Sequence, residues 1–276
     1  MARRRLDAEL VRRGLVSTTT EAADAVRNGL VLVSGRSADN PSTLVDPAEP
    51  LVMTRADSPF VSRGGEKLEA ALERFGIDVS GLRCLDAGAS TGGFTDCLLR
   101  RGAEHVIAVD VGYGQLAWSL RTDPRVTLLE RTNVRDLKPE TLAFAPDVVV
   151  ADLSFVSLRS VVPALARLAG FGARFVLLVK PQFEVGRDRV GPNGVVRDAR
   201  AWRDAIEGVA EAGARVGLTA LGAIASPVLG PAGNVEFPLF AAEGAAAVPF
   251  DASDAIVEGE RLVSADARGG TRSVRS

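Results

Sequence analysis

The chain has 276 residues, of which 46% are apolar and 25% are charged, and its formal net charge is −2. This composition is typical of a globular protein with a sizeable core, and it excludes a chain that is collagen-like or disordered throughout. The small net charge excludes a uniformly basic nucleic-acid binder, so any basic surface must be local. One histidine, His105, and two cysteines, Cys84 and Cys97, predict neither a disulfide framework nor a metal site.

No segment has the pattern of a membrane span or of a secretory signal. The richest apolar window, residues 161–179, is interrupted by Arg167 and Arg174, whereas a span needs about 20 mostly apolar residues. The N-terminus is basic but no apolar stretch follows its arginines. The sequence therefore predicts a cytoplasmic protein that makes no membrane contact, with both cysteines reduced and buried.

Residues 1–55 are expected to form a small α+β domain. Apolar residues at helical spacing, together with turn residues such as Gly14, Gly29 and Gly35, divide it into helices and short strands. The expected elements are helices over residues 6–13 and 20–28 and strands over residues 30–33 and 51–53. The first 13 residues carry five arginines and two acids, so their net charge is +3 and the first helix is the basic edge of the domain.

Residues 56–63 are predicted to be a linker, because Ser58-Pro59 disfavours a helix. From residue 64 to 243, continuous apolar runs alternate with helix-like stretches, which is the pattern of a parallel sheet covered on both faces. The runs that predict buried strands are residues 106–109, 126–129, 148–151 and 175–179.

Two closely spaced strands are expected within residues 218–240, as a hairpin at one edge of the sheet. Residues 244–276 are weakly patterned and are expected to be partly disordered. A short helix is predicted near residues 252–263, with disorder beyond Ala267.

The first chemical signal is a glycine-rich turn between a predicted strand and a predicted helix. Its glycines are Gly88, Gly92 and Gly93, whereas a dinucleotide fingerprint would need one at position 90, so the spacing argues against NAD. Asp110 follows at the end of the next strand, where a carboxylate can accept both ribose hydroxyls. A nucleoside cofactor without a pyrophosphate, such as S-adenosylmethionine, fits this pattern. A purely structural glycine turn is the alternative.

Four charged residues form the second signal. Asp152 and Lys180 directly follow apolar strands, at the sheet edge where open parallel sheets bind ligands. Lys67 is predicted in a helix after the linker, and Glu236 lies near the last strand. Only three of the 33 basic residues are lysines. Their use at 67 and 180 indicates ammonium groups that can release a proton, which arginine cannot do. The alternative, surface lysines kept by chance, is adopted for Lys138.

Two further features have less specific interpretations. His105 precedes the second strand of the sheet, at the end away from the expected site, and is interpreted as structural or exposed. Thr132-Asn133-Val134 follows the third strand, where a cofactor's base could pack; an asparagine turn would explain it equally well.

Taken together, these motifs resemble the TlyA family. The matching segments are Ser62-Arg-Gly-Gly-Glu-Lys-Leu68, Asp86-Ala-Gly-Ala-Ser-Thr-Gly-Gly-Phe-Thr-Asp96, Val109-Asp-Val-Gly-Tyr-Gly-Gln-Leu116, Arg131-Thr-Asn-Val134, Asp152-Leu-Ser-Phe155, Lys180-Pro-Gln-Phe-Glu184 and Gly194-Val-Val. The resemblance covers roughly residues 1–243. It implies an S4-like RNA-binding domain (1–55) before an FtsJ-like methyltransferase domain (64–243) with a Rossmann-like class I fold.

The resemblance also implies an activity: 2′-O-methylation of cytidine in 16S or 23S ribosomal RNA, or in both, by S-adenosylmethionine and without a metal. The catalytic set it implies is Lys67, Asp152, Lys180 and Glu236. The cofactor-binding set is Asp86, Gly88, Ser90, Thr91, Gly92, Gly93, Phe94, Asp110 and Asn133. The RNA-binding set is Arg3, Arg4, Arg5, Arg12, Arg13 and Arg63. The N-terminal domain lacks two cations that the family usually has, since residues 18–20 are all threonine and Asn40 precedes Pro41, so we expect weaker RNA docking.

Lys180 is expected to face the attacking 2′-hydroxyl, either as the base or as a cation that holds the developing alkoxide. Asp152 and Glu236 would orient the lysines and balance their charge. Two other functions stay open: a methyltransferase that acts on another acceptor, and an RNA-binding or membrane-active, haemolysin-like protein without methyltransferase activity.

Overall fold

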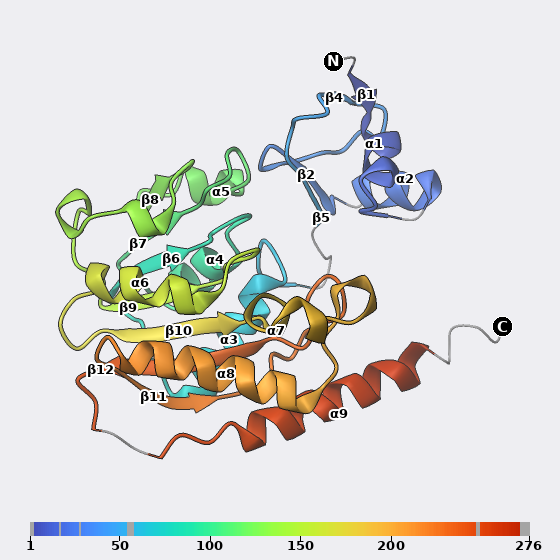
Figure 1. Cartoon of the computed structure of the whole chain (residues 1–276). Helices are drawn as coiled ribbons and strands as arrows, with labels where there is room; N and C mark the ends of the chain where they lie inside the picture. The colour runs from blue at the N-terminus through green and yellow to red at the C-terminus, as the bar shows by residue number, and fades with distance from the viewer. Residues whose placement is uncertain (1–2, 17, 28, 54–57, 247–248, 271–276) are drawn as a thin grey trace.

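The computed structural model describes residues 3–16, 18–27, 29–53, 58–246 and 249–270, without the side chains of residues 24, 27 and 266–270. A small N-terminal domain sits beside a larger α/β domain, and a long C-terminal helix runs out from the latter (Figure 1).

In its described residues, the N-terminal domain has two helices and five short strands. Its elements are β1 (Arg4–Arg5), α1 (Leu6–Arg12), α2 (Thr19–Arg27), β2 (Val31–Val33), β3 (Arg36–Ser37), β4 (Leu44–Val45) and β5 (Leu51–Met53). Strand β2 pairs with β3 and β5, while β1 pairs with β4. Leu6, Leu10 and Val26 pack in its core. The two helices and strands β2 and β5 confirm the prediction to within one residue at each end.

The α/β domain alternates strands with helices, as predicted. Its elements are α3 (Gly64–Phe75), β6 (Arg83–Ala87), α4 (Gly93–Arg100), β7 (His105–Val109), α5 (Trp118–Arg121), β8 (Val126–Leu129), β9 (Val148–Ala151), α6 (Val162–Leu168), β10 (Arg174–Val179), α7 (Pro181–Glu184), α8 (Ala199–Ala214), β11 (Leu218–Ala223), β12 (Phe237–Glu243) and α9 (Ser253–Gly270).

One seven-stranded sheet runs through this domain in the order β11-β12-β10-β9-β6-β7-β8. Strands β6 to β10 are parallel, and β12 is antiparallel to both β10 and β11. The predicted antiparallel pair at one edge is therefore confirmed. It is not a tight hairpin, because residues 224–236 separate the two strands and carry part of the site described below.

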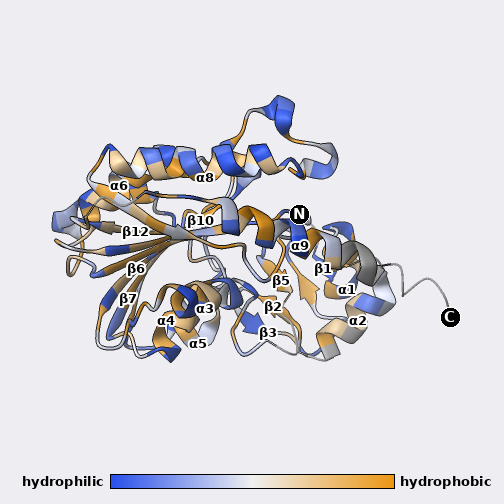
Figure 2. Cartoon of the chain, turned by 90° about the horizontal axis from the view of Figure 1, so that it is seen from below, coloured by the Kyte–Doolittle hydropathy of each residue, from blue (hydrophilic) through white to orange (hydrophobic). Residues whose placement is uncertain are grey.

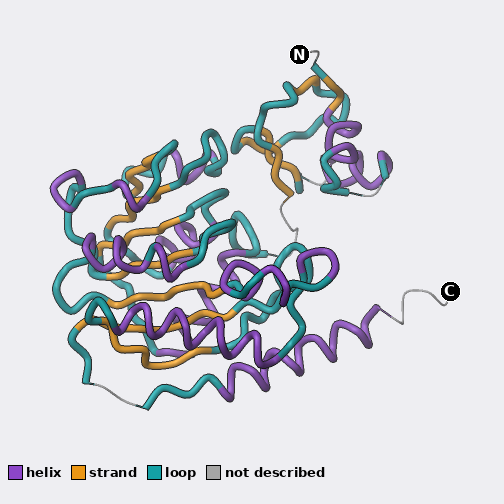
Figure 3. The backbone as a smooth tube through the Cα atoms, viewed as in Figure 1, coloured by secondary structure: helices purple, strands orange, loops and turns teal. Residues whose placement is uncertain are grey.

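Helices cover both faces of the sheet. Alternate strand residues such as Val149 and Phe175 pack against α6, α8 and α9. Their neighbours Val150 and Val176 pack against α3, α4 and α5. Figure 2 shows α6 and α8 on one side of the apolar strands and α3, α4 and α5 on the other, and Figure 3 shows the strands in orange with helices in purple beside them. Burial on both faces explains why the strands are continuous apolar runs.

The sheet has a topological switch between β6 and β9, because the chain moves from β6 toward β8 and later returns to β9 on the other side. The carboxyl ends of these two strands meet, and the Asp152 N–H donates to the Ala87 carbonyl at 3.0 Å. Ligands of open α/β sheets bind in the crevice at such a point.

The segment predicted as a linker is partly fixed to the α/β domain. Phe60 is buried in that domain's core, and the Val61 N–H donates to Asp96 Oδ2 at 2.9 Å. Residues 56 and 57 of the predicted linker lie outside the described residues.

The two domains also touch directly. The β2–β3 turn contacts α5, where the Trp118 N–H donates to the Gly35 carbonyl at 2.8 Å.

The C-terminal helix is longer than predicted. Helix α9 begins one residue after the predicted start and continues to Gly270, and the disorder expected beyond Ala267 stays a prediction. Ala252, Ala255 and Ile256 recur at helical spacing and are buried against the sheet layer. Residues 271–276 lie outside the described residues.

Candidate active site

The glycine turn after β6 forms one wall of the crevice. The N–H groups of Gly88 and Ala89 both donate to the Val109 carbonyl, which ties the turn to β7. Gly88 has a φ of +89°, and a Cβ there would lie 2.5 Å from the Asp152 carbonyl oxygen. A side chain at this position would therefore force β6 and β9 apart, so the close approach of the two strand ends requires glycine.

Asp110 lies at the end of β7, beside this turn. Its Oδ2 accepts the Ser90 N–H at 2.8 Å and its Oδ1 accepts the Gly112 N–H at 2.6 Å. Each carboxylate oxygen can accept two hydrogen bonds, so one position on each oxygen is left for a ligand. Asp110 lines a cavity of about 420 Å³ together with Gly88, Ser90 and Asn133. We call this space the cofactor cavity.

The cofactor cavity fits a nucleoside cofactor. The two free acceptor positions of Asp110 suit a pair of ribose hydroxyls, and the glycine turn lines the cavity beside them. The Asn133 side chain accepts the Arg135 N–H at 3.1 Å, so the asparagine turn exists and also lines the cavity. The asparagine turn is therefore confirmed, whereas contact with a cofactor's base stays a prediction.

Two members of the predicted cofactor-binding set lie behind the turn. Asp86 is fully buried, and Thr95 Oγ1 donates to its Oδ2 at 2.7 Å. Burial, with a smaller contribution from Asp152, raises the pKa of Asp86 to about 7. Gly92 begins α4 with a φ of +100° and faces Leu120. Neither residue lines the cofactor cavity, so their cofactor contact stays a prediction.

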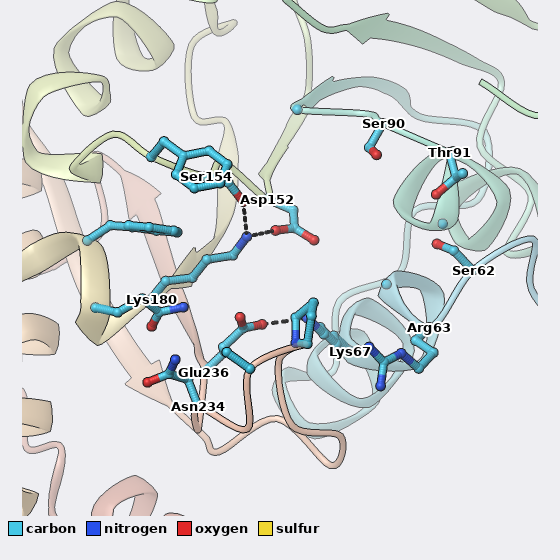
Figure 4. A pocket seen from close by; sticks show the side chains of 18 of the residues that line it. Ser62, Arg63, Lys67, Ser90, Thr91, Asp152, Ser154, Lys180, Asn234 and Glu236 are labelled. Atoms are coloured by element: carbon cyan, nitrogen blue, oxygen red, sulfur yellow. Dashed lines mark hydrogen bonds and ion pairs between the residues drawn. The ribbon is translucent and has the colours of Figure 1, made fainter. Parts of the chain in front are cut away.

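The four predicted catalytic residues meet around a second cavity of about 810 Å³, which we call the catalytic cavity (Figure 4). Lys67 Nζ lies 2.5 Å from Glu236 Oε2. Lys180 Nζ lies 2.6 Å from Asp152 Oδ1 and donates to Ser154 Oγ at 2.9 Å. Each lysine therefore has its own carboxylate.

Burial makes this pairing necessary. Lys67, Lys180 and Glu236 are all buried, and Asp152 is half-buried. A buried charge without a partner costs several kcal/mol, whereas each of these two opposite pairs is neutral. The expectation that the acids orient the lysines and balance their charge agrees with this geometry.

The two cavities are joined. Both are lined by Gly88, Ser90, Asp152, Ser154 and Phe155. Thr91, Gly93 and Phe94, which were predicted to bind the cofactor, line the catalytic cavity. A ligand in the cofactor cavity thus borders directly on the space that holds Lys180.

Several lining residues were not predicted. Ser154 is the hydrogen-bond partner of Lys180, and Gln182 lies two residues beyond that lysine. Asn234 bridges two loops, since its Oδ1 accepts the Val196 N–H and its Nδ2 donates to the Gly194 carbonyl, both at 2.9 Å. Val52 and Met53 of β5 also line the cavity. Of these residues, Ser154 and Gln182 could have been suspected from the sequence, because each lies two positions after a charged residue at a strand end, Asp152 and Lys180 respectively.

The predicted RNA-binding arginines differ in their surroundings. Arg3 is exposed, and the Arg4 side chain is 58% exposed with its Nε 3.9 Å from Glu9. Arg5 is paired with Asp7. Arg12 and Arg13 both bind Glu9, which is buried and whose pKa their hydrogen bonds lower to about 2.

Arg13 has a clear structural role. Its guanidinium also donates to the carbonyls of Pro47 and Glu49, at 2.9 and 2.7 Å. Arg63 lies apart from the N-terminal arginines and lines the catalytic cavity. RNA contact by these arginines stays a prediction.

The residues given no catalytic role lie where expected. His105 begins β7, at the opposite end of the strand from Asp110, and its Nε2 is 2.8 Å from Thr127 Oγ1. Both cysteines are buried, and burial raises the pKa of Cys84 to about 12.

Within the described ranges, no three His, Cys, Asp or Glu side chains are grouped so as to hold a metal ion. No helix in the described part of the chain has the length and apolar character to cross a membrane.

The fold and the joined cavities define a methyltransferase domain of the Rossmann-like type, preceded by a small α+β domain. Comparison with known families agrees: the FtsJ-like methyltransferase family matches residues 60–242, and the S4 domain family matches residues 4–50.

The chain belongs to the TlyA family. It is 54% identical over 242 residues to "16S/23S rRNA (cytidine-2′-O)-methyltransferase TlyA" of Mycobacterium tuberculosis, covering 87% of this chain and 90% of the relative. It is 36% identical over 238 residues to "Hemolysin A" of Brachyspira hyodysenteriae, and the match covers 84% of this chain and 97% of that relative. The solved structure "Putative hemolysin from Streptococcus thermophilus" matches with a TM-score of 0.76 at 36% identity, over 99% of each chain.

Proposed function

We propose that this protein methylates the ribose 2′-oxygen of a cytidine in ribosomal RNA, in the small or large subunit or in both, with S-adenosylmethionine as methyl donor. The observation that carries the proposal is the pair of buried lysine–carboxylate contacts facing a cavity that borders on the cavity lined by Asp110. The activity named for the Mycobacterium tuberculosis relative supports the choice of acceptor. A ribosomal substrate would place the protein in the cytoplasm.

The residues around the cofactor cavity would hold S-adenosylmethionine. Asp110 would accept the ribose hydroxyls, Asn133 would border the base, and the turn at Gly88 would pass beneath the amino-acid part. When bound, the cofactor supplies a methyl group already activated by its sulfonium. The protein therefore has to position the acceptor and manage its proton.

Lys180 would act on the 2′-hydroxyl in one of two ways: as a neutral amine it accepts the proton, or as an ammonium it holds the developing alkoxide while the proton passes to water. As an ammonium, its Nζ donates to Ser154 Oγ and forms an ion pair with Asp152, so one donor position is still free. That position can contact the hydroxyl oxygen as negative charge develops on it. Asp152 keeps the amine in place, while Lys67 and Glu236 form the facing pair across the cavity.

RNA would be held by both domains. Arg3 and Arg4 present cations at the N-terminal edge, and Arg63 presents one at the catalytic cavity itself. Such cations bind phosphate, which sets affinity and register without selecting a sequence. The lining contributed by Met53 brings the S4 domain to the rim of the same cavity.

The proposal is tested by mapping 2′-O-methyl groups in ribosomal RNA from cells with and without this protein, and in purified ribosomal subunits after incubation with it and S-adenosylmethionine. We expect one or a few cytidines to gain a 2′-O-methyl group only when the protein is present. An unchanged map in both settings would contradict the proposal. Transfer to a small molecule instead would favour a methyltransferase with another acceptor.

A further inference from the structure

Two segments of the catalytic cavity wall are joined by a row of contacts. At one end, Lys180 Nζ meets Asp152 Oδ1 at 2.6 Å. Further along, the ring of Phe183 lies 5.3 Å from the ring of Phe155. Glu184, the next residue, makes the contacts at the other end. These contacts join the loop after β9, which carries Asp152, to the segment after β10, which carries Lys180.

Glu184 is buried and uses both carboxylate oxygens on that loop. Its Oε2 accepts the Ser157 hydroxyl at 2.6 Å, and its Oε1 accepts the Leu158 N–H at 2.6 Å. Arg159 adds two contacts: its Nε lies 3.4 Å from Oε2, and its guanidinium donates to the Glu184 carbonyl at 2.8 Å. All of these partners belong to residues 157–159, a few positions beyond Asp152.

Packing alone does not explain a carboxylate here. Burial raises the pKa of Glu184, and the hydrogen bonds from Ser157, Leu158 and Arg159 oppose this rise. An apolar side chain would fill the space without the cost of removing a charge from water. The carboxylate offers what an apolar side chain cannot, which is fixed geometry between two loops.

We propose that Glu184 is a positioning residue for methyl transfer: by holding residues 157–159 against α7, it fixes Asp152 and Ser154 where Lys180 needs them. This inference rests on the proposed function, since methyl transfer is the reaction it serves. Lys180 immediately precedes α7 and Glu184 ends it, so the helix transmits the constraint over one turn. A displacement of about 1 Å at reacting groups can lower a rate by about 10²-fold.

Two variants of Glu184 and one control test this role. Glu184→Ala removes both acceptors. Glu184→Gln keeps an acceptor for the Leu158 N–H and supplies a donor for the Ser157 hydroxyl. Asp147→Asn is the control, because the Asp147 carboxylate also accepts a backbone N–H, that of Arg83 at 2.9 Å, but lies at the other end of β9.

The measurements are the single-turnover methylation rate on ribosomal subunits, the dissociation constants for S-adenosylmethionine and RNA, and the melting temperature. We expect Glu184→Ala to lose about 10²-fold in rate while both affinities stay within about twofold, because the lost constraint acts on the transition state. Glu184→Gln should recover most of the rate, and Asp147→Asn should match the wild type. A normal rate in Glu184→Ala, or a Gln variant as slow as the Ala variant, would overturn the proposal.

Amide hydrogen exchange gives a readout that does not depend on catalysis. The Leu158 N–H loses its acceptor in Glu184→Ala and should exchange faster there, but not in Asp147→Asn. If the Leu158 amide exchanges at the same rate in Glu184→Ala and in the wild type, Glu184 does not hold residues 157–159, and the proposal is overturned whatever the methylation rates are. If the wild-type protein methylates no RNA at all, the proposed function fails, and this exchange measurement alone decides whether Glu184 fixes the loop.

Discussion

The Lys180 ammonium is held by one carboxylate and one hydroxyl, and its geometry gives the sharpest test at the residue scale. We expect Lys180→Arg to lower the single-turnover methylation rate by ~10²–10⁴-fold, the usual contribution of proton transfer by a positioned group. Arginine keeps the charge but cannot release a proton, and its planar head cannot replace a compact ammonium between Asp152 and Ser154.

Lys138→Arg is the matched control, because Lys138 is exposed and lies outside both cavities. Affinities for S-adenosylmethionine and RNA should change little in either variant, since the lost interaction belongs to the transition state. Near-normal turnover by Lys180→Arg would remove Lys180 as the group that handles the proton and would direct attention to Lys67.

Asp86 makes a prediction about stability. Its pKa is raised to about 7 in the folded protein by burial, whereas an unfolded aspartate titrates near 3.9. Between these two values the folded state holds a proton that the unfolded state has released. The contribution of Asp86 to the free energy of unfolding therefore falls as pH rises from about 4 to about 7, by about 4 kcal/mol at most, and levels off above that.

Asp86→Asn should remove this fall, because asparagine stays neutral and can still accept the Thr95 hydroxyl. Urea unfolding of both proteins at pH 5 and pH 8 measures it. The variant should gain stability relative to the wild type at pH 8 more than at pH 5. An equal difference at the two pH values would show that Asp86 is charged throughout.

The arginines on either side of helix α1 fall into two groups. Arg4, in strand β1, has a largely exposed side chain, whereas Arg13 binds Glu9 and two backbone carbonyls. We expect Arg4→Gln to reduce the salt dependence of RNA binding by the release of about one counterion, a change of ~0.7–0.9 in the slope of log affinity against log salt. Arg13→Gln should instead lower stability by about 1–3 kcal/mol and leave the slope nearly unchanged.

Titrations of RNA binding at several salt concentrations, together with thermal unfolding, separate these effects. A slope change of the same size in both variants would mean that Arg13 leaves its internal partners when RNA binds. No change in either would move the RNA-binding surface away from α1.

The elements also show which parts of the fold were predictable. Strands β7 to β10 were predicted to within one residue, because each is a mostly apolar run. Strands β7, β9 and β10 are buried along nearly their whole length, whereas the edge strand β8 is half-buried. The two-residue strands β1, β3 and β4 were missed, since their pairing depends on partners distant in the chain. Helix α9 was predicted too short, because residues 264–270 contain no large apolar side chain that would continue its pattern.

The same reasoning applies to the site. Asp110, Asp152 and Lys180 were predicted from their places at strand ends. Which carboxylate each lysine takes could not be predicted, because it depends on the path of residues 224–236, which deliver Glu236 to Lys67. Long-range partners of this kind leave no local signal.

At the scale of the whole molecule, the two domains meet through Gly35. Its φ is +78°, and a Cβ there would lie 2.2 Å from the Leu116 carbonyl oxygen. We expect Gly35→Ala to push the domains apart, which would enlarge the particle in solution scattering. It should also lower the rate of RNA methylation, because the S4 domain would no longer reach the cavity.

Gly14→Ala is a matched control, since Gly14 has a φ of +69° in the same domain but nothing within 4 Å of its Cβ position. Both variants bear the left-handed strain of roughly 1–2 kcal/mol, but only Gly35→Ala has the clash. Equal scattering and equal methylation rates for the two variants would show that this contact does not set the domain arrangement.

Val52 and Met53 of the N-terminal domain line the catalytic cavity. This limits how the N-terminal domain could be exchanged for another one. Phe60, which precedes the methyltransferase domain in the chain, is buried in the core of that domain. Residues on both sides of the domain boundary therefore contribute to the other domain's surroundings. An RNA-binding module from another protein, grafted ahead of residue 64, would bring its own cations but would leave the cavity without part of its rim and the core without an aromatic ring. Domain shuffling at this boundary therefore has to carry residues 52–63 along with the methyltransferase.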